Sequence, residues 1–565
     1  MSHFYPFVIN PSNDILKKYP SLPKLTEQLS QDYAQHCVTE TSLKTIGLLL
    51  WQSLQIDEQF NQLYQKYQSL ALIIQFQNQQ IHLLPWECLY HPTLGFFSRQ
   101  TNFTLSRRFL KQTLTKNFSL LTPIRILLFS LPHEELQLEF EQYEIYQVLR
   151  QFITQGRVQL FICDNGDFAH FQALLQQQTW HLVLFSGHHL LTTETKESFF
   201  IFENEQGQKE AIATNEIATL FQSVICVVLL ACQTAQFAQQ LAQRGVPYVI
   251  GIQAEILDRA AVIFIKNFLM SLLQQGRIDV AVQYGRKKLT NLLINNEKWH
   301  DSNNYQGQCN YQGQWILPIL LSNHLTNDFL LRFMASESIP TFLQCNISAF
   351  SVLIGRRKGV QNLLKIVKSG HYPQLLITGV RGIGKTAFAE HVVNRLYLED
   401  YNVFACQAST LIELTDALSK WLKITTFEAC EIKIALTRIK SQKWIIWLDH
   451  INSNQYVAMS CFFEQLSNFA NFSILMTSYE RFSIPTNCYQ YNLTKLDFED
   501  FVRYVHYLGL PYEAIQLRLL YQFSAGNFRA IQLLQTMPIQ KVSKEFMQQL
   551  ISIKRYLQAY LRQNG

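Results

Sequence analysis

GVRGIGKT, from Gly379 to Thr386, is the stretch that decides the fold of the second half of the chain. It fits the pattern G-x-x-x-x-G-K-[ST], with the apolar run QLLIT before it and the helical pattern TAFAEHVVNRLY beginning at Thr386. Glycines let consecutive backbone N–H groups turn inward around phosphate oxygens, where a Cβ would obstruct them. The segment predicts a strand, a phosphate-binding loop with Gly379, Gly382 and Gly384, and a helix whose N-terminus faces the phosphates.

Two side chains carry the chemistry of this loop. Lys385 would place a positive charge on the outer phosphates, and Thr386 would offer its hydroxyl to Mg²⁺. The metal also needs an acidic residue at the end of a buried strand, and KWIIWLD ends in Asp449. Many P-loop ATPases carry a second acid there to orient the attacking water, but the next residue here is His450. We therefore expect ATP and Mg²⁺ to bind, with slow hydrolysis or none.

Outward from the loop, short apolar runs alternate with helical patterns on both sides of an aperiodic stretch near residues 326–348. Solid apolar runs are typical of strands buried on both faces, so the pattern predicts wound α/β sheets, the first of them mostly parallel. The pattern becomes purely helical after Asp497. The expected strands are 125–130, 158–163, 181–187, 224–232 and 246–252 in the first series, and 374–379, 402–408, 443–449 and 472–478 in the second.

Composition narrows the classes of function. The 565 residues are 48% hydrophobic and 16% charged, with a net charge of +6 and no block of like charge. These values favour two to four globular domains and give no sign of a nucleic-acid or membrane surface. The 11 cysteines are odd in number and form no C-x-x-C pair, which disfavours zinc and disulfide frameworks. The start MSHFYPFVIN lacks a signal-peptide pattern and no apolar run spans a bilayer, so we expect a cytoplasmic protein.

Two reactive side chains follow strands of the first series: His188 in FSGHH and Cys232 in LLACQT. Reacting groups collect at the carboxyl ends of parallel strands, so these two would face each other if their strands are neighbours. Thiol catalysis needs a thiolate, a nearby base and N–H donors for the oxyanion. Cys232 and His188 meet the first two needs, and the N–H groups of Cys232 and His189 could meet the third. A buried cysteine at a strand end is also commonly inert packing.

The surrounding motifs are LPWECLYHPTLGFF (84–97), LVLFSGHH, VVLLACQTA and the long segment LAQRGVPYVIGIQAEILDRAAVIF and onward (241–289). From about 70 to 322 the chain resembles the CHAT domain, a relative of caspases and separases in the same clan of cysteine peptidases. The resemblance implies a caspase-like sheet, with Cys232 as nucleophile and His188 as general acid and base of an endopeptidase. The family usually has glycine where His189 stands, which leaves an inactive scaffold, or His189 as the base, as alternatives.

Other residues of this region have less specific interpretations. Trp86 and Glu87 look like the family's W-E pair, which we interpret as a packing feature of the fold. Glu203, Glu255 and Asp258 are candidates to line a pocket for a basic substrate side chain, although each is more commonly a solvated charge.

The second half contains LIGR (353–356), the phosphate loop, the strand ending at Asp449, SILMTSYER (473–481) and SAGNFRAIQLL (524–534). This order resembles the signalling ATPases of the STAND class, relatives of the AAA+ and NB-ARC proteins. The resemblance implies that Arg356 lies by the adenine and that Thr477 senses the γ-phosphate. Arg481 is a candidate sensor, but Tyr479 stands where the family has its arginine, and Phe528 replaces a proline.

Together these patterns predict a nucleotide-regulated, caspase-like cysteine endopeptidase, with a scaffold gated by the ATPase as the alternative. A protein substrate, ATP-linked self-association and a role in signalling or bacterial defence follow only from the families. Because few residues follow the ATPase, we expect a separate sensor or activator protein. The expected parts are a helical segment at 1–70, the CHAT domain at 71–325, a linker at 326–348, the ATPase core at 349–496 and a helical lid at 497–565.

Overall fold

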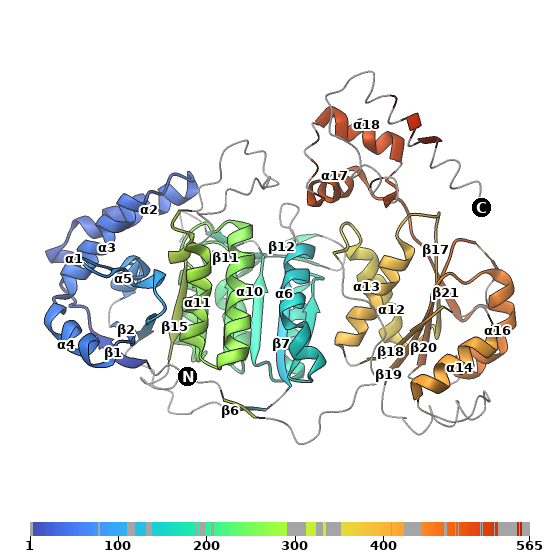
Figure 1. Ribbon diagram of the computed structural model, residues 1–565, viewed down its shortest axis with the longest axis horizontal. Helices are drawn as coiled ribbons and strands as arrows, with labels where there is room; N and C mark the ends of the chain where they lie inside the picture. The colour runs from blue at the N-terminus through green and yellow to red at the C-terminus, as the bar shows by residue number, and fades with distance from the viewer. Residues whose placement is uncertain are drawn as a thin grey trace. The chain divides into compact units, whose positions relative to one another are not determined.

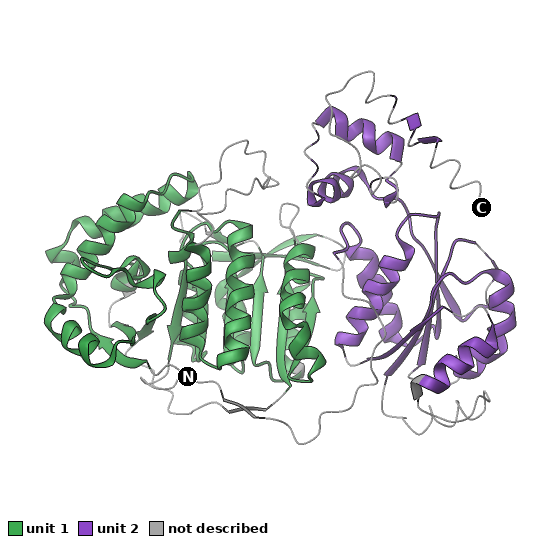
Figure 2. Ribbon diagram, in the orientation of Figure 1, with its two compact units in different colours: residues 1–298, 305–339 green, residues 299–304, 340–565 purple. Residues whose placement is uncertain are grey.

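The computed structural model is a mixed α/β protein (Figure 1) and divides into two compact units (Figure 2). Unit 1 contains residues 1–298 and 305–339, and unit 2 contains residues 299–304 and 340–565. The structure describes residues 4–76, 79–109, 119–121, 123–131, 138–187, 189–191, 198–204, 208–290, 312–323, 332–334, 352–399, 401–407, 410–422, 443–467, 472–480, 482–483, 485–508, 510, 512, 514–524, 526–528, 531, 548, 551–552 and 554–555. None of the helices in these ranges is long and apolar enough to cross a membrane.

Unit 1 is built on a nine-stranded sheet of order β1-β2-β5-β15-β14-β13-β9-β7-β8. The strands from β1 to β15 in that order are mutually parallel, and so are those from β14 to β8. The two sets meet at the antiparallel pair of β14 and β15. The strands are β1 (Tyr5–Ile9), β2 (Leu70–Phe76), β5 (Phe103–Phe109), β7 (Ile124–Ser130), β8 (Val158–Cys163), β9 (Leu182–Ser186), β13 (Cys226–Leu230), β14 (Tyr248–Ile252) and β15 (Pro318–Ser322).

The five strands expected in the first series are all present, as β7, β8, β9, β13 and β14. The expectation for residues 1–70 needs correction, because this segment is not only helical. Its strand β1 pairs in parallel with β2 and so belongs to the nine-stranded sheet. Between them run α1 (Ile15–Lys18), α2 (Ser21–Ala34), α3 (Glu40–Leu54) and α4 (Asp57–Tyr67).

Helices cover both faces of the second strand set. Phe129 and Phe185 pack against α7 (Phe168–Gln177), α8 (Thr214–Ala218) and α9 (Ala235–Gln243) on one face. Figure 1 shows α6 (Leu138–Thr154), α10 (Asp258–Gln275) and α11 (Ile278–Thr290) side by side along the sheet, in agreement with the contacts of α10 with both neighbours. Because strand side chains alternate between faces, Ser130 and Ser186 point away from the face of Phe129 and Phe185. The remaining short elements of unit 1 are α5 (Gln79–His82), β3 (Tyr90–His91), β4 (Gly95–Phe96), β6 (Ser119–Leu121), β10 (His189–Leu191), β11 (Ser198–Glu203), β12 (Lys209–Ala213) and β16 (Arg332–Met334).

Unit 2 contains a five-stranded parallel sheet of order β18-β19-β20-β17-β21. Alternate residues of its strands face two apolar cores, Leu376 toward α14 and α16, and Leu375 and Ile377 toward α12 and α13. The four expected strands are present, and β21 is an addition. The elements are α12 (Arg357–Ser369), β17 (Gln374–Thr378), α13 (Lys385–Leu398), β18 (Tyr401–Cys406), α14 (Leu411–Leu422), β19 (Lys443–Leu448), α16 (Ser453–Ser467), β20 (Phe472–Ser478) and β21 (Cys488–Asn492).

After β21 the described chain is helical, as the sequence predicts. α17 (Phe498–Tyr507) begins at Asp497, whose side chain accepts a hydrogen bond from the backbone N–H of Asp500 at 2.8 Å and caps the helix. α18 (Ala514–Ser524) packs on α17 around Phe501 and Leu520. The expected linker at 326–348 lies outside the described residues except for β16.

Candidate nucleotide and thiol sites

The phosphate loop connects β17 to α13, as its sequence predicts. Gly382 and Gly384 have φ values of +76° and +92°, in the left-handed region that disfavours other residues. A Cβ on Gly379 would lie 2.7 Å from the backbone oxygen of Leu493, closer than real contacts allow. These glycines therefore permit the backbone path of the loop, which leads into the N-terminus of α13.

Lys385 folds back onto the loop. Its Nζ donates to the carbonyl oxygens of Gly379 at 2.8 Å and Val380 at 3.1 Å. Burial lowers the pKa of Lys385 to about 8, with Asp449 opposing the shift and Arg381 adding to it. The ammonium group remains mostly charged at neutral pH. It is held by two neutral carbonyls that phosphate oxygens could replace.

The order of the sheet brings three polar side chains together at its carboxyl edge. β20 lies between β17 and β19, so Thr477 comes next to the residue that follows β19. The hydroxyl of Thr477 donates to Asp449, and Thr386 Oγ1 lies 3.1 Å from each carboxylate oxygen of Asp449. Two hydroxyls and a carboxylate are oxygen ligands of the kind Mg²⁺ prefers, in a site that would be completed by water and nucleotide phosphates.

His450 stands beside this cluster in place of a second acid. Its φ of +60° turns the backbone so that its N–H donates to Thr477 Oγ1 at 2.9 Å. Its Nδ1 lies 2.8 Å from Asp449 Oδ2, while the side chain is 62% exposed. The residue thus orders Thr477 and Asp449 and contributes no carboxylate.

The segment at the end of α18 packs directly on the loop. Asn527 Nδ2 donates to the backbone oxygen of Arg381 at 2.8 Å. The ring of Phe528 lies 3.3 Å from the position of a Cβ on Gly384, and the Arg356 guanidinium is 5.8 Å from the centre of that ring. Arg356 is buried and donates to the oxygen of Thr494 at 2.6 Å, and burial lowers its pKa.

Tyr479 has a partner that sequence reasoning missed. The guanidinium of Arg381, in the loop itself, lies 4.5 Å from the centre of the Tyr479 ring. The departure from the family pattern at Tyr479 is the signal that could have suggested a local contact of this kind. The candidate sensor Arg481 lies outside the described residues.

ATP with Mg²⁺ fits these residues, because the loop has glycines at positions 379, 382 and 384 and the polar groups of Lys385, Thr386 and Asp449 are of the right kind. Lys385, Gly382 and Gly384 would hold phosphates, and Thr386 and Asp449 would hold the metal. Elsewhere in the described residues, no group of three or more His, Cys, Asp or Glu side chains is placed to bind a metal ion.

In unit 1, the strands that precede the predicted catalytic pair are neighbours. β9 and β13 pair in parallel with Ser186 opposite Leu230, so the residues after both strands leave the same edge of the sheet. Cys232 lies two residues beyond β13, whereas His188 lies outside the described residues. The adjacency on which the prediction depends is therefore present.

The thiol of Cys232 is partly buried and hydrogen-bonded to a neighbouring loop. Its Sγ donates to the backbone oxygen of Ile256 at 3.7 Å. Burial raises the pKa of Cys232 to about 11, and the carboxylates of Glu255 and Asp258 add to the increase. Since a thiolate is the nucleophile, this arrangement would need to change before the thiol reacts.

The structure separates the other candidates of this region. The charges of Glu255 and Asp258 raise the pKa of Cys232. Glu203 lies instead at the end of β11, opposite Lys209. His189 begins β10, and its ring lies 5.0 Å from the ring of Phe200. That packing favours a structural role for the His189 side chain over that of a general base.

Sequence reasoning missed a buried carboxyl at the same sheet edge. Ser186 Oγ donates to Glu141 Oε2 at 2.8 Å, and Glu141 Oε1 has no hydrogen-bond partner among the described residues. Burial raises the pKa of Glu141 to about 7. Glu141 lies three residues after buried Leu138 and four before buried Ile145, and this helical spacing could have revealed it.

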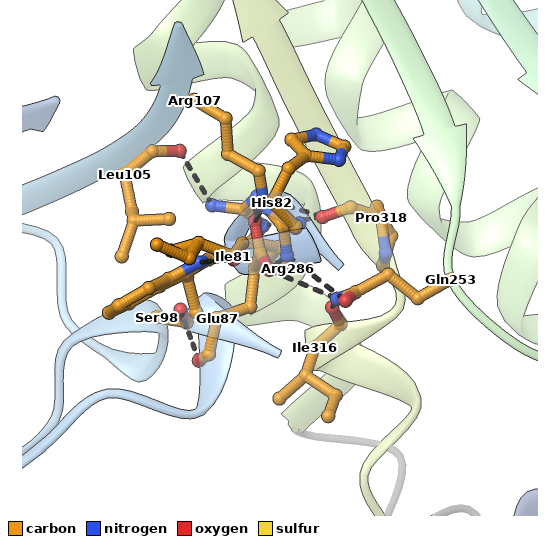
Figure 3. A network of polar contacts seen from close by, with 11 residues as sticks. Ile81, His82, Glu87, Ser98, Leu105, Arg107, Gln253, Arg286, Ile316 and Pro318 are labelled. Atoms are coloured by element: carbon orange, nitrogen blue, oxygen red, sulfur yellow. Dashed lines mark hydrogen bonds and ion pairs between the residues drawn. The ribbon is translucent and has the colours of Figure 1, made fainter. Parts of the chain in front are cut away.

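Trp86 and Glu87, the W-E pair, also make polar contacts. Trp86 Nε1 donates to the backbone oxygen of Ile81 at 2.9 Å, and Glu87 is fully buried. The Glu87 carboxylate forms ion pairs with both Arg107 and Arg286, which ties the first strand set to α11 (Figure 3).

Comparisons with known proteins agree with the sequence analysis at the level of domains. Residues 40–309 match the CHAT domain, a little less than half of the 565 residues. CHAT domains belong to the caspase-like clan of cysteine peptidases. No curated protein matches the chain.

Solved structures resemble parts of the chain weakly. A STAND protein with a tetratricopeptide repeat sensor from Pyrococcus horikoshii is 14% identical, covers 38% of this chain and has a TM-score of 0.28. The match spans only 34% of that protein's length. DnaA from Aquifex aeolicus bound to AMPPCP is 17% identical, with 35% of this chain and 64% of DnaA covered and a TM-score of 0.25.

Proposed function

We propose that the protein is a caspase-like cysteine endopeptidase whose activity is controlled by ATP binding to unit 2. The observation that carries this proposal is the position of Cys232 directly beyond β13, beside the strand that leads to His188, within the segment that matches the CHAT domain. In a parallel sheet this edge is where reacting groups collect.

The chemistry would begin with the thiol. His188 would accept the Sγ proton of Cys232, and Sγ would then attack the carbonyl carbon of the scissile peptide bond. The N–H groups of Cys232 and His189 would receive the developing oxyanion. His188 would return the proton to the departing amine, and water would hydrolyse the thioester.

Nucleotide binding would change two parts of unit 2, the phosphate loop and the segment that follows α18. Lys385 would exchange the carbonyls of Gly379 and Val380 for phosphate oxygens, and Asn527 and Phe528 would respond because they pack on the same loop. A difference in nucleotide affinity between two states sets how far the equilibrium moves. Coupling of about 1–3 kcal/mol would change activity about 5- to 150-fold.

His450 supports a switch over a motor, because it supplies no carboxylate to activate water. We therefore propose slow hydrolysis or none. ATP-linked self-association and a role in bacterial defence are further parts of the proposal that come from the families.

A catalytically inactive scaffold is the second candidate. It is favoured by the state of the thiol, since the pKa of Cys232 is about 11 and its Sγ donates a hydrogen bond to the backbone oxygen of Ile256. The extra side chain of His189 where the family has glycine points the same way. In this case ATP would gate the binding of a partner.

The test compares the new protein N-termini that the wild type and Cys232→Ala generate in a cytosolic lysate, with and without ATP and Mg²⁺. We expect ends that depend on both Cys232 and ATP. Ends that ignore nucleotide would refute the gating, and lack of Cys232-dependent ends with a nucleotide-dependent partner would support the scaffold.

A further inference from the structure

The phosphate loop carries a second cation, Arg381, in addition to Lys385. The Arg381 side chain is partly buried, and its guanidinium lies 4.5 Å from the centre of the Tyr479 ring. Within the part of the chain that the structure describes, this guanidinium makes no hydrogen bond and no ion pair. Its five N–H groups can therefore bind a ligand without breaking an existing contact of that kind.

The positive charge of Arg381 is not neutralised by its surroundings. An aromatic ring attracts a cation through its quadrupole but carries no charge of its own. Glu480, the acid that follows Tyr479, is used elsewhere, because its carboxylate accepts a hydrogen bond from the backbone N–H of Ser453 at 3.3 Å. The charge of Arg381 also reaches Lys385, since it contributes to the lowered pKa of that ammonium group. A polyphosphate between the two cations would relieve their repulsion.

The order of the sheet indicates which part of a nucleotide Arg381 would meet. β17, which leads into the loop, has β20 on one side and β21 on the other. Tyr479 directly follows β20, so the Arg381 side chain extends toward the β20 side. Thr477 of β20 donates to Asp449, the proposed metal ligand, on that same side. Because Mg²⁺ bridges the two outer phosphates in P-loop sites, this is the side of the terminal phosphate.

We propose that Arg381 binds the γ-phosphate of ATP and makes the site discriminate ATP from ADP. Tyr479 would hold the guanidinium near the loop before the nucleotide binds. Two parallel N–H groups of the guanidinium would then donate to oxygens of the γ-phosphate, as arginine does in bidentate pairs with phosphate. The inference rests on the nucleotide-binding part of the proposed function and adds the residue that distinguishes the two nucleotides.

Arg381 also contacts the segment that follows α18. Its backbone oxygen accepts a hydrogen bond from Asn527 Nδ2 at 2.8 Å. A ligand shifts an equilibrium only by the difference in its affinity for the two states. A contact that forms with ATP and not with ADP supplies such a difference, at a residue that Asn527 touches. Arg381 therefore connects the identity of the bound nucleotide to the helical segment.

The test measures nucleotide affinity and needs no catalysis. A fluorescent ADP analogue bound to the full-length protein is displaced by ADP or by a non-hydrolysable ATP analogue, each with Mg²⁺. We expect Arg381→Ala to weaken the ATP analogue about tenfold or more and ADP no more than about twofold, since only ATP carries the phosphate that Arg381 contacts. Retained ADP binding also shows that the variant is folded. Equal weakening of both nucleotides, or of neither, would overturn the proposal.

Two further variants sharpen the test. Arg381→Lys should keep part of the ATP preference, because an ammonium group still attracts phosphate but lacks the planar pair of donors. Lys443→Ala is the matched control: Lys443 is an exposed cation 5.2 Å from the centre of the Tyr401 ring, at the start of β19 and so at the opposite edge of the sheet. It should leave the affinity for both nucleotides unchanged. An equal loss of ATP preference in Lys443→Ala would contradict a specific role for Arg381.

Cleavage measured on the same proteins separates this inference from the function on which it rests. Loss of ATP preference in Arg381→Ala, with no Cys232-dependent cleavage by the wild type, would leave the γ-phosphate contact standing and refute the peptidase. ATP-dependent cleavage by the wild type, with an unchanged ATP preference in Arg381→Ala, would leave the peptidase standing and refute the contact.

Discussion

The phosphate loop and the thiol site differ in how they are assembled. The loop is one continuous segment whose glycines and Lys385 fix their own geometry, and its two outside partners, Asp449 and Thr477, arrive through strands paired next to each other. The thiol site is made from separate loops, and the thiol of Cys232 donates to a backbone oxygen of another loop.

The difference shows that a continuous motif can determine a binding geometry by itself, whereas the reactivity of a side chain depends on contacts from other segments. The loop can receive phosphate by exchanging two hydrogen bonds of Lys385. Cys232 must first leave Ile256 and lose a proton with a pKa of about 11. In the proposed function the first site therefore binds without a large rearrangement, whereas the second requires activation.

The largest expected effect is that of Cys232→Ala on proteolysis. Loss of a nucleophile in a cysteine or serine enzyme removes activity by about a thousandfold or more, so ATP-dependent cleavage should fall below detection. ATP binding should be unchanged, because Cys232 lies in unit 1 and the loop in unit 2. Cys226→Ala, in the buried core of β13, is a control for effects of packing. Cleavage that survives Cys232→Ala would remove the thiol from the mechanism.

The next effect concerns thiol reactivity. With a pKa of about 11, Cys232 holds about a hundredfold less thiolate at pH 7 than an ordinary thiol does. Iodoacetamide should therefore label it about a hundredfold more slowly than exposed Cys461, with a rate that rises about tenfold per pH unit below pH 10. Peptide mapping by mass spectrometry measures both rates. Faster labelling with ATP would show that the nucleotide activates the thiol, and equal labelling of both cysteines without ATP would contradict the raised pKa of Cys232.

Lys385→Ala should weaken ATP binding about 10- to 100-fold, because one charge-assisted interaction with phosphate contributes about 1.5–3 kcal/mol. Titration with a fluorescent ATP analogue measures the change. Lys420→Ala is the matched control, since Lys420 is an exposed residue of α14 paired with Asp416. If Lys385→Ala bound ATP with normal affinity, the proposed nucleotide site would be wrong.

The smallest effect is on stability and involves Glu141. Its pKa is about 7 in the folded protein and about 4.5 when unfolded, so the folded state holds its proton more tightly between these values. Stability is therefore lost as pH rises from about 4.5 to 7, and above that the loss is complete. Glu141→Gln cannot ionise, so its melting temperature relative to wild type should rise by a few degrees between pH 5 and pH 8. Exposed Glu210→Gln should show no such trend.

Periodicity predicted the elements around both sites, because buried parallel strands read as continuous apolar runs. The pairing of β9 with β13, and of β20 with β17 and β19, could only be stated as a condition or taken from a resemblance. The part played by residues 1–70 was missed, since YPFVI is too short a run to distinguish a strand from a helix lead-in. The family resemblance supplied most of what was expected of individual residues.

The electrostatic part of the sites was the least predictable. Nothing in the local sequence says that Arg107 and Arg286, from β5 and α11, share the carboxylate of Glu87. The hydrogen bond of the Cys232 thiol is equally hard to predict from the sequence, because it depends on the path of the loop at Ile256. Such properties arise from contacts between segments far apart in the chain.

The pairing of β15 with both β5 and β14 has a consequence for synthesis. The register sets Leu321 opposite Arg107, two residues about 200 positions apart, and such distant pairings form late in folding. Until residue 322 has left the ribosome, β5 and β14 each present an open strand edge that can pair with another chain. Expression fragments that stop before β15 are therefore expected to aggregate, and useful boundaries for isolating unit 1 lie beyond it.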